Sequence, residues 1–395
     1  MSFHVLIPDS VHPSALEVFK AAGDHIRVTA GGQMTRAEAI AALPEADALI
    51  IRSATKVDAE LLGHAAKLKA IARAGVGVDN VDVKQASAQD IVVIDHGRVI
   101  AEVPNAALTD EAPIYERPFR EPESQIRLRT MPDVGPSPAP RDAFFRLLAS
   151  PGIASKQWIY RQYDSMVRTN TMVPAGAGAG VVRVKGTEKA LAMSVDGNGR
   201  YCLLDPYEGA RLAVAEAARN VACAGGAPIG VTNCLNFGNP ERPEIMWQFA
   251  EAVRGIGDAC RALELPVTGG NVSLYNETDG QAVLPTPVIG VLGLIDTVDA
   301  VRARVFPAET LDIVLLGTTK DEFGGSEYLK TMHGLVRGVP PALDLALERG
   351  LQSLLVEAAS RNWIRSSYDC ADGGFAVALA EGCFTGGGGA GVGIA

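Results

Sequence analysis

Apolar and polar positions in the first 94 residues alternate between short buried-type runs and segments with helical spacing. The predicted strands are 5–8, 26–28, 48–51, 68–71 and 91–94. A helix is expected from about Pro13 to Ala22, Thr35 with Glu38 forms a capping pattern, and Asp58 opens a third helix. Strands that alternate with helices in this way indicate an open parallel sheet, whose ligands bind at the carboxyl ends of the strands.

From Gly180 onward the predicted elements are longer. Strands are expected at 181–184 and 190–195, followed by a helix from about Asp205 to Ala224, a strand at 229–232 and a helix at 243–263. Leu265–Val267 has the pattern of a short buried strand, and Gly269–Gly270 predicts a sharp turn after it. The apolar run 311–316 is expected to begin a further domain, so the fold class is α/β combined with α+β.

Between these parts the pattern changes. Prolines and charges are frequent from 111 to 141, which favours an extended connector over a packed core. The aromatic residues in 155–164 have nearly helical spacing and are expected in a core. The expected domains are 1–94, a segment 95–150 with a strand and the connector, 151–305 and 306–395.

Composition limits the class of protein. The chain has 395 residues, 47% of them hydrophobic, and a formal net charge of −10, which argues against a nucleic-acid partner. No signal peptide and no apolar run of about 18 residues appears, so no membrane segment is expected. The six cysteines include no C-x-x-C pair. We therefore expect a reduced, cytoplasmic protein.

The residues that are candidates for ligand binding are concentrated in Thr268–Thr278. After the glycine pair, this stretch offers oxygen atoms of the kind that Mg²⁺ prefers, from Asn271, Ser273, Asn276 and Glu277. A hairpin turn with polar caps explains the same residues equally well. The chain order predicts Asp196, Asn233 and Asn271 at strand ends on one rim, with Asp196 either a metal ligand or a turn residue.

Four motifs together resemble phosphoribosylformylglycinamidine synthase in its small, multi-subunit form: 194–202, 231–240, 270–277 and 369–374. The similarity runs from about Asp95 to the end and implies domains of the aminoimidazole ribonucleotide synthetase type, the last one truncated. It implies ATP contacts at Asn233, where the family usually has Asp, and at Gly270. It further implies Mg²⁺ at Asn271 and the substrate formylglycinamide ribonucleotide at Ser273. The implied partners are a glutaminase subunit and a small accessory subunit.

The first stretch differs, since 51–56 and 72–81 resemble the N-terminal domain of D-3-phosphoglycerate dehydrogenases. This implies a flavodoxin-like domain with substrate contacts in two loops, at Arg52, Ser53, Arg73, Gly75 and Gly77. The nucleotide domain of that family, with its G-x-G-x-x-G turn, does not follow. The chain thus resembles a fusion of two partial enzymes.

Three functions follow as alternatives. The first is ATP-dependent amidine formation in purine biosynthesis, partial or inactive alone because the synthase's first repeat, with its active-site histidine, is missing. Glu123-Ser-Gln125 matches a substrate motif of that repeat but is interpreted as coincidence. The second is an NAD-dependent 2-hydroxyacid dehydrogenase, for which no nicotinamide site is encoded. The third is a non-catalytic nucleotide-binding or assembly role.

Overall fold

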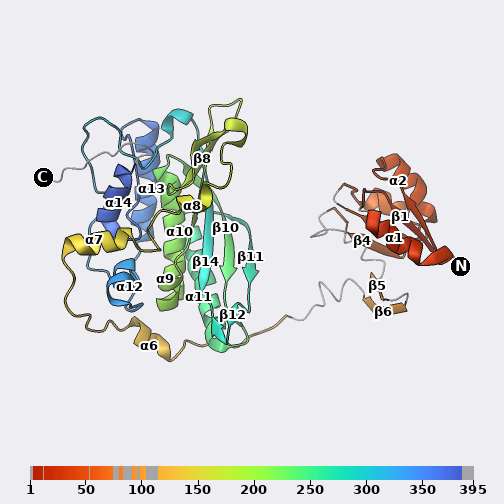
Figure 1. The fold of residues 1–395 in the computed structure, drawn as a ribbon, viewed down its shortest axis with the longest axis horizontal. Coiled ribbons are helices and arrows are strands. Elements are labelled where there is room, and N and C mark those ends of the chain that lie inside the picture. Colours follow the sequence, from red (N-terminus) through yellow and green to blue (C-terminus); the bar gives the residue numbers. More distant parts are fainter. Residues whose placement is uncertain are drawn as a thin grey trace. The chain divides into compact units, whose positions relative to one another are not determined.

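A computed structural model describes residues 3–11, 13–52, 54–73, 80–82, 91–95, 98–103 and 114–384. The chain divides into two compact units, Met1–Glu116 and Arg117–Ala395 (Figure 1). Among the helices of the described ranges, none combines the length and apolarity needed to cross a bilayer.

The first unit is built on a parallel sheet in the order β2-β1-β3-β4. Its strands are β1 (Phe3–Ile7), β2 (Ile26–Ala30), β3 (Ala48–Ile51) and β4 (Ala70–Arg73), and its helices are α1 (Pro13–Ala21), α2 (Arg36–Ala42) and α3 (Ala59–Gly63). The side chains of Leu6, Leu49 and Ile51 are fully buried in its core. The predicted parallel sheet is confirmed, although β4 begins two residues later than expected. Thr35 and Glu38 form the predicted capping box on α2.

The strands β5 (Ile91–Asp95) and β6 (Arg98–Val103) pair with each other as an antiparallel hairpin. They form a separate two-stranded sheet and do not extend the parallel one. The predicted domain boundary between residues 94 and 95 therefore lies within this hairpin.

The second unit contains a six-stranded sheet in the order β11-β10-β14-β9-β8-β7. The strands are β7 (Thr171–Val173), β8 (Gly180–Arg183), β9 (Ala190–Asp196), β10 (Ala227–Asn236), β11 (Val267–Ser273) and β14 (Thr286–Ile295). Only β10 and β11 are parallel neighbours. The edge positions belong to β11 and β7.

Two predictions about the β11 segment are wrong. Gly269 and Gly270 do not form a turn, because their pairing with β10 continues through both residues. Val267 is 49% exposed and not buried, because β11 is the edge strand. The turn comes later, in a small hairpin of β12 (Glu277–Thr278) and β13 (Gln281–Ala282).

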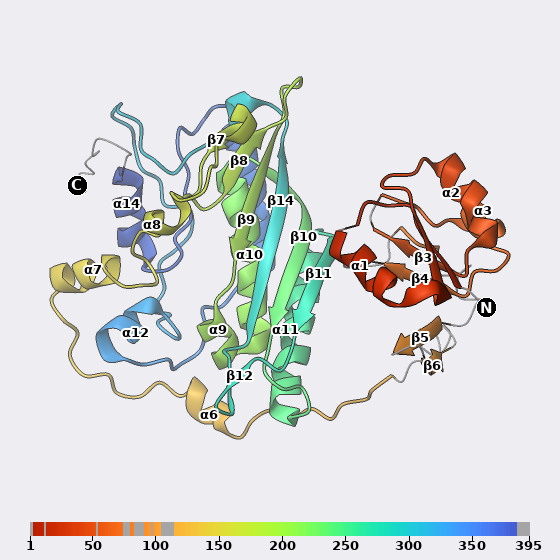
Figure 2. The ribbon, with the colours of Figure 1, turned by 45° about the vertical axis from the view of Figure 1, so that its right-hand side comes forward.

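One face of this sheet is covered by α10 (Pro206–Cys223) and α11 (Pro243–Ala262), as Figure 2 shows. The short helix α9 (Gly199–Leu204) precedes α10, and Asp205 caps α10 by accepting from the Glu208 backbone N–H. Both long helices were predicted within one or two residues. The inward face of α10 is mostly alanine, which lets the helix approach the strands closely.

Helices α12 (Glu327–His333), α13 (Leu345–Ser360) and α14 (Gly374–Cys383) complete the unit. Helix α13 packs on α10, while α12 and α14 pack on α7 (Pro140–Leu148). The described residues between 306 and 384 contain no strand. The run 311–316 has no regular secondary structure and is exposed.

The connector before α7 is extended in part, but α6 (Ser124–Arg129) docks on α9. Gln125 is buried, and its Nε2 donates to the carbonyl oxygens of Leu203 (3.1 Å) and Leu204. The predicted core role of the 155–164 aromatics is wrong, since Trp158 and Tyr163 are exposed. Helix α8 (Gln157–Tyr160) has a single turn, too short to present an apolar face to the core.

Candidate functional site

Three of the predicted site residues lie in one row across four neighbouring strands. Gly270 is in register with Asn233, Asn233 with Ile289, and Ile289 with Asp196. Ile289 is fully buried against the helices, so the side chains of Asn233 and Asp196 point to that same face. Two strand spacings separate them, roughly 10 Å. Asn233 lies within β10 and not at its end, contrary to prediction.

Gly270 occupies a position where a side chain does not fit. A Cβ there would lie 2.4 Å from Asn233 Oδ1 and 2.5 Å from the Asn233 carbonyl oxygen. The backbone of Gly270, with φ of 156°, can therefore approach Asn233 closely only because the residue is glycine.

Asn271 and Ser273 are in register with Cys234 and Asn236, which follow Asn233 by one and three residues. Their side chains therefore point to the sheet face opposite Asp196 and Asn233. The structure does not bring Asp196, Asn233 and Asn271 onto one rim.

Asn276 and Glu277 stabilise the turn after β11 through hydrogen bonds. Asn276 Nδ2 donates to the Ser273 carbonyl (2.9 Å) and the Phe237 carbonyl (3.1 Å). Glu277 Oε1 accepts from the Asn239 backbone N–H at 3.1 Å. These contacts fit the hairpin explanation of the two residues.

In the first unit, the Arg52 loop is held by Asp9, which is 4% exposed. The Asp9 carboxylate accepts from the Arg52 backbone N–H (2.5 Å) and the Thr55 hydroxyl (2.5 Å). The exposed Arg52 guanidinium donates to the Ser10 carbonyl at 3.2 Å. Arg73 ends β4, whereas Ser53, Gly75 and Gly77 lie outside the described residues.

A cluster of which sequence reasoning found only Asp196 lies where α10 meets β9 and the loop before α14. Helix α10 directs Glu216, Arg219 and Asn220 to this place, since residues three and four apart share a helix face. Asn220 Nδ2 donates to Asp196 Oδ2 at 3.2 Å. We call Asp196, Glu216, Asn220, Asp369 and Asp372 the acidic cluster.

Arg219 on α10 lies beside this cluster. It donates two hydrogen bonds to Glu348 on α13, at 2.8 and 2.9 Å, and its Nη1 lies 3.6 Å from Asp369 Oδ2. At the far side, Arg200 pairs with Asp372 at 3.2 Å and with the buried Glu327 at 3.0 Å. Carboxylates therefore outnumber the guanidinium groups that neutralise them.

Burial and like charge disturb the acidity of these groups. Burial, and then the neighbouring Asp196 and Asp369, raise the pKa of Glu216 to about 8. Burial raises the pKa of Asp369 to about 6, although Arg219 acts against the rise. Burial also raises the pKa of Asp196 and of Asp372. Removing such groups from water disfavours their charged forms, so these carboxyl groups keep their protons to higher pH than exposed ones do.

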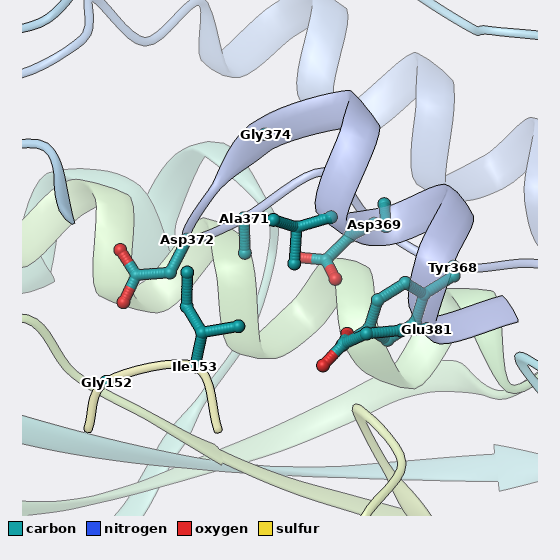
Figure 3. Close-up of a pocket in the computed structure, with 10 residues that line it drawn as sticks. Gly152, Ile153, Tyr368, Asp369, Ala371, Asp372, Gly374 and Glu381 are labelled. Atoms are coloured by element: carbon teal, nitrogen blue, oxygen red, sulfur yellow. The ribbon is translucent and has the colours of Figure 1, made fainter. Parts of the chain in front are cut away.

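Beside the cluster lies a cavity of about 130 Å³, which we call the acidic pocket. Figure 3 shows Asp372 at one end, Glu381 with Tyr368 at the other, and Asp369 between them. Gly374, the first residue of α14, has open space where a Cβ would stand. Gly152 and Ile153 close the opposite wall.

Two buried atoms of the cluster lack hydrogen-bond partners, namely Asn220 Oδ1 and Asp369 Oδ2. Their residues are 5% and 4% exposed. Buried oxygens without donors are costly, and hard divalent cations are bound by carboxylate and amide oxygens. Within the described ranges, no three His, Cys, Asp or Glu side chains already converge as metal ligands. The cluster thus fits Mg²⁺ by donor type, with side-chain adjustment required.

Signals for the missed residues were present but indirect. The motif 369–374 contributed to the resemblance, and Glu216 and Asn220 have the i, i+4 spacing of a shared helix face. Neither signal pairs α10 with the loop before α14, which only the tertiary structure does.

Three family models match parts of the chain. Residues 176–295 match "AIR synthase related protein, N-terminal domain" and residues 312–395 match the C-terminal domain of the same description. Residues 5–109 match "D-isomer specific 2-hydroxyacid dehydrogenase, catalytic domain". The second unit thus has domains of the AIR synthase type, and the N-terminal part is similar to a different family.

Curated relatives match most of the chain. The chain is 49% identical over 339 residues to "Phosphoribosylformylglycinamidine synthase subunit PurL" of Moorella thermoacetica, covering 84% of this chain and 46% of the relative. It is 54% identical over 296 residues to the subunit of the same name from Anaeromyxobacter sp., covering 73% and 38%. The chain spans less than half the length of these relatives. The structure "T. maritima PurL complexed with ATP" has 27% identity over 54% of this chain and 32% of that one, with a TM-score of 0.40.

Proposed function

We propose that the second unit carries the ATP-dependent chemistry of a phosphoribosylformylglycinamidine synthase subunit. The observation that carries this proposal is the acidic cluster with two buried oxygens that accept no hydrogen bond, Asn220 Oδ1 and Asp369 Oδ2, the second of which has only the Arg219 guanidinium near it, at 3.6 Å. The cluster joins residues from both segments that match AIR synthase models. Relatives about 50% identical bear the synthase name.

The cluster would hold Mg²⁺ through oxygens of Asp196, Asn220 and Asp369. When bound, this ion neutralises phosphate oxygens and polarises the phosphoryl group that is transferred. Asp196 and Asn220 are already linked at 3.2 Å. Arg219 is held by its two hydrogen bonds to Glu348 and lies 3.6 Å from Asp369. Its positive charge therefore limits the repulsion among the carboxylates of the cluster while no cation is bound.

Further ATP contacts are proposed at Asn233 and Gly270, on the same row as Asp196. Asn233 supplies an amide where the family usually has Asp, so it adds no negative charge. Asn271 and Ser273 point to the other sheet face. If they bind metal and substrate, they do so at a second place and not at the acidic cluster.

The proposed substrate is formylglycinamide ribonucleotide. ATP phosphorylates its amide oxygen, forming ADP, and ammonia then attacks the amide carbon and expels phosphate to leave the amidine. The ammonia is proposed to come from glutamine through a glutaminase partner, with a small accessory subunit completing the assembly. The chain's own contribution is charge stabilisation and positioning of the phosphates. We propose low turnover for this chain alone, because it spans less than half the length of the relatives.

The N-terminal unit is proposed to carry no dehydrogenase chemistry of its own. Its Arg52 guanidinium is exposed, and we propose that it binds a carboxylate or phosphate together with Arg73 and the loop residues Ser53, Gly75 and Gly77. Titration of the chain with NADH tests the dehydrogenase alternative. Saturable binding, with fluorescence transfer from protein to nicotinamide, would contradict our assignment.

The proposed function is tested by a turnover assay on the full chain. Formylglycinamide ribonucleotide, Mg·ATP and ammonium chloride are supplied, and the amidine product is measured by mass spectrometry. Product that requires all three reagents, and is lost in Asp369→Asn but kept in Glu264→Gln on the surface, supports the synthase function. Mg·ATP binding without product supports the non-catalytic alternative instead, and loss of both refutes the proposal.

A further inference from the structure

The guanidinium group of Arg200 joins three segments that lie around the acidic pocket. Its Nε donates to the Gly325 carbonyl oxygen at 3.0 Å, its Nη1 lies 3.0 Å from Glu327 Oε2, and its Nη2 donates to Asp372 Oδ1 at 3.2 Å. These acceptors belong to the loop before α12, to α12 and to the loop before α14. Arg200 therefore links the segment 176–295 to the segment 312–395, which match two different family models.

The backbone that carries Arg200 is held in place. Asn198 caps α9, and its Oδ1 accepts from the backbone N–H groups of Arg200 (3.1 Å) and Tyr201 (3.3 Å). Gly325 has φ of 70°, and a Cβ there would lie 2.9 Å from side-chain carbons of both Leu204 and Tyr201. The loop before α12 is thus in tight contact with α9, and the Arg200 side chain is only 15% exposed.

Through Glu327, Arg200 also supports a wall of the pocket. The Glu327 side chain is fully buried, and a Cβ at Gly152 would lie 2.8 Å from its carboxyl carbon. Figure 3 shows Gly152 in the pocket wall and Asp372 at one end of the pocket. A buried carboxylate requires a cation, and Arg200 at 3.0 Å lies closer to Glu327 than Lys330 does, at 3.4 Å. Movement of Glu327 would therefore disturb the wall.

We propose that Arg200 is a positioning residue that sets the places of Asp372 and of the Gly152 wall at the acidic pocket. This inference rests on the proposed function of the second unit. Arg200 is not among the described residues that line the pocket, so it acts through Asp372 and Glu327. Transfer of a phosphoryl group depends on placement, and a misplacement of ~1 Å can lower the rate about 100-fold.

Arg200→Lys tests the inference, because it keeps a positive charge beside Glu327 but loses the planar fork that reaches three acceptors. The dissociation constant of Mg·ATP, measured by calorimetry on the full chain, should rise about 10- to 100-fold. Arg349→Lys changes an exposed ion pair with Glu264, so it is the matched control and should leave the dissociation constant unchanged. If Arg200→Lys lowers only the free energy of unfolding, and the folded chain binds Mg·ATP as the wild type does, the inference is overturned.

Hydrogen exchange measured by mass spectrometry tests the positioning without any ligand. In Arg200→Lys, the backbone amides of 323–328 and 370–376 should exchange faster than in the wild type. Those of 346–356, on α13, should exchange at the wild-type rate. Unchanged exchange in 323–328 and 370–376 would contradict the role of Arg200.

The double variant Arg200→Gln with Glu327→Gln covers the case in which Arg200→Lys does not fold. It removes both charges of the buried pair, so no unpaired charge remains inside the protein. It should fold, exchange faster at 370–376 and bind Mg·ATP more weakly, and wild-type binding would overturn the inference. A folded wild type that binds no Mg·ATP refutes the proposed function and this inference with it, whereas equal binding by the wild type and Arg200→Lys refutes only the role of Arg200.

Discussion

Replacing Glu216 by glutamine should change how the stability of the second unit depends on pH. The folded protein raises the pKa of Glu216 from 4.5 to about 8, first through burial and then through Asp196 and Asp369. A raised carboxyl pKa means that the folded state binds the proton more tightly. Its stabilising effect is complete below pH 4.5 and is lost as pH rises through about 8.

The size of the effect follows from the shift. At about 1.4 kcal/mol per unit, the rise corresponds to at most about 5 kcal/mol. Glu216 is partly open to water, so we expect ~1–3 kcal/mol. Between pH 5 and pH 8.5, the unfolding free energy of the wild type should fall by this much more than that of Glu216→Gln.

Tryptophan fluorescence during urea unfolding provides the assay. All three tryptophans, Trp158, Trp247 and Trp363, lie in the second unit, so the signal reports this unit alone. EDTA keeps the cluster free of metal, and Glu264→Gln serves as the control for a carboxylate outside it. If Glu216→Gln shows the same pH slope as the wild type, burial and like charge do not raise the pKa of this carboxyl.

Three further predictions concern packing and are measured by urea unfolding followed by fluorescence. Gly270→Ala should lower the free energy of unfolding by ~2–4 kcal/mol, because the added Cβ meets the Asn233 backbone. Adding Asn233→Ala should not restore stability, and full restoration would show that the clash is with the Asn233 side chain alone. Gln125→Ala should lower the free energy of unfolding by ~1–3 kcal/mol and expose the connector to proteolysis, because the Gln125 amide holds α6 to the end of α9. An unchanged digestion pattern would contradict this. Arg302→Met should cost ~3 kcal/mol or more, since the buried guanidinium donates to carbonyls of Ile364 and Ala359 among others; a neutral result would contradict that role.

Elements with strong local signals were predictable from the sequence. The parallel sheet of the first unit has short apolar strands separated by capped helices, and Thr35 with Glu38 marks one helix start directly. The long helices α10 and α11 have apolar periodicity over several turns and proline at their first position. Local pattern decides such elements.

Positions set by tertiary context were not predictable. Glycines usually indicate turns, yet Gly270 lies within a strand because it must pass close to Asn233. Trp158 is large and apolar, as core residues usually are, but it is exposed because its helix is only one turn long. The acidic cluster draws on β9, α10 and the loop before α14, so no local pattern contains it. Asp196 was found because carboxylates after strands are typical ligands, whereas its partner Asn220 lies within a helix.

The central claim is that the acidic cluster binds a divalent cation together with a nucleotide. Calorimetric titration of the full chain with ATP in Mg²⁺, compared with Asp369→Asn and with Asn271→Ala, tests it most directly. We predict binding that Asp369→Asn abolishes and that Asn271→Ala, on the opposite sheet face, leaves intact. No binding to a folded wild-type chain, or loss in Asn271→Ala with Asp369→Asn unaffected, would contradict it.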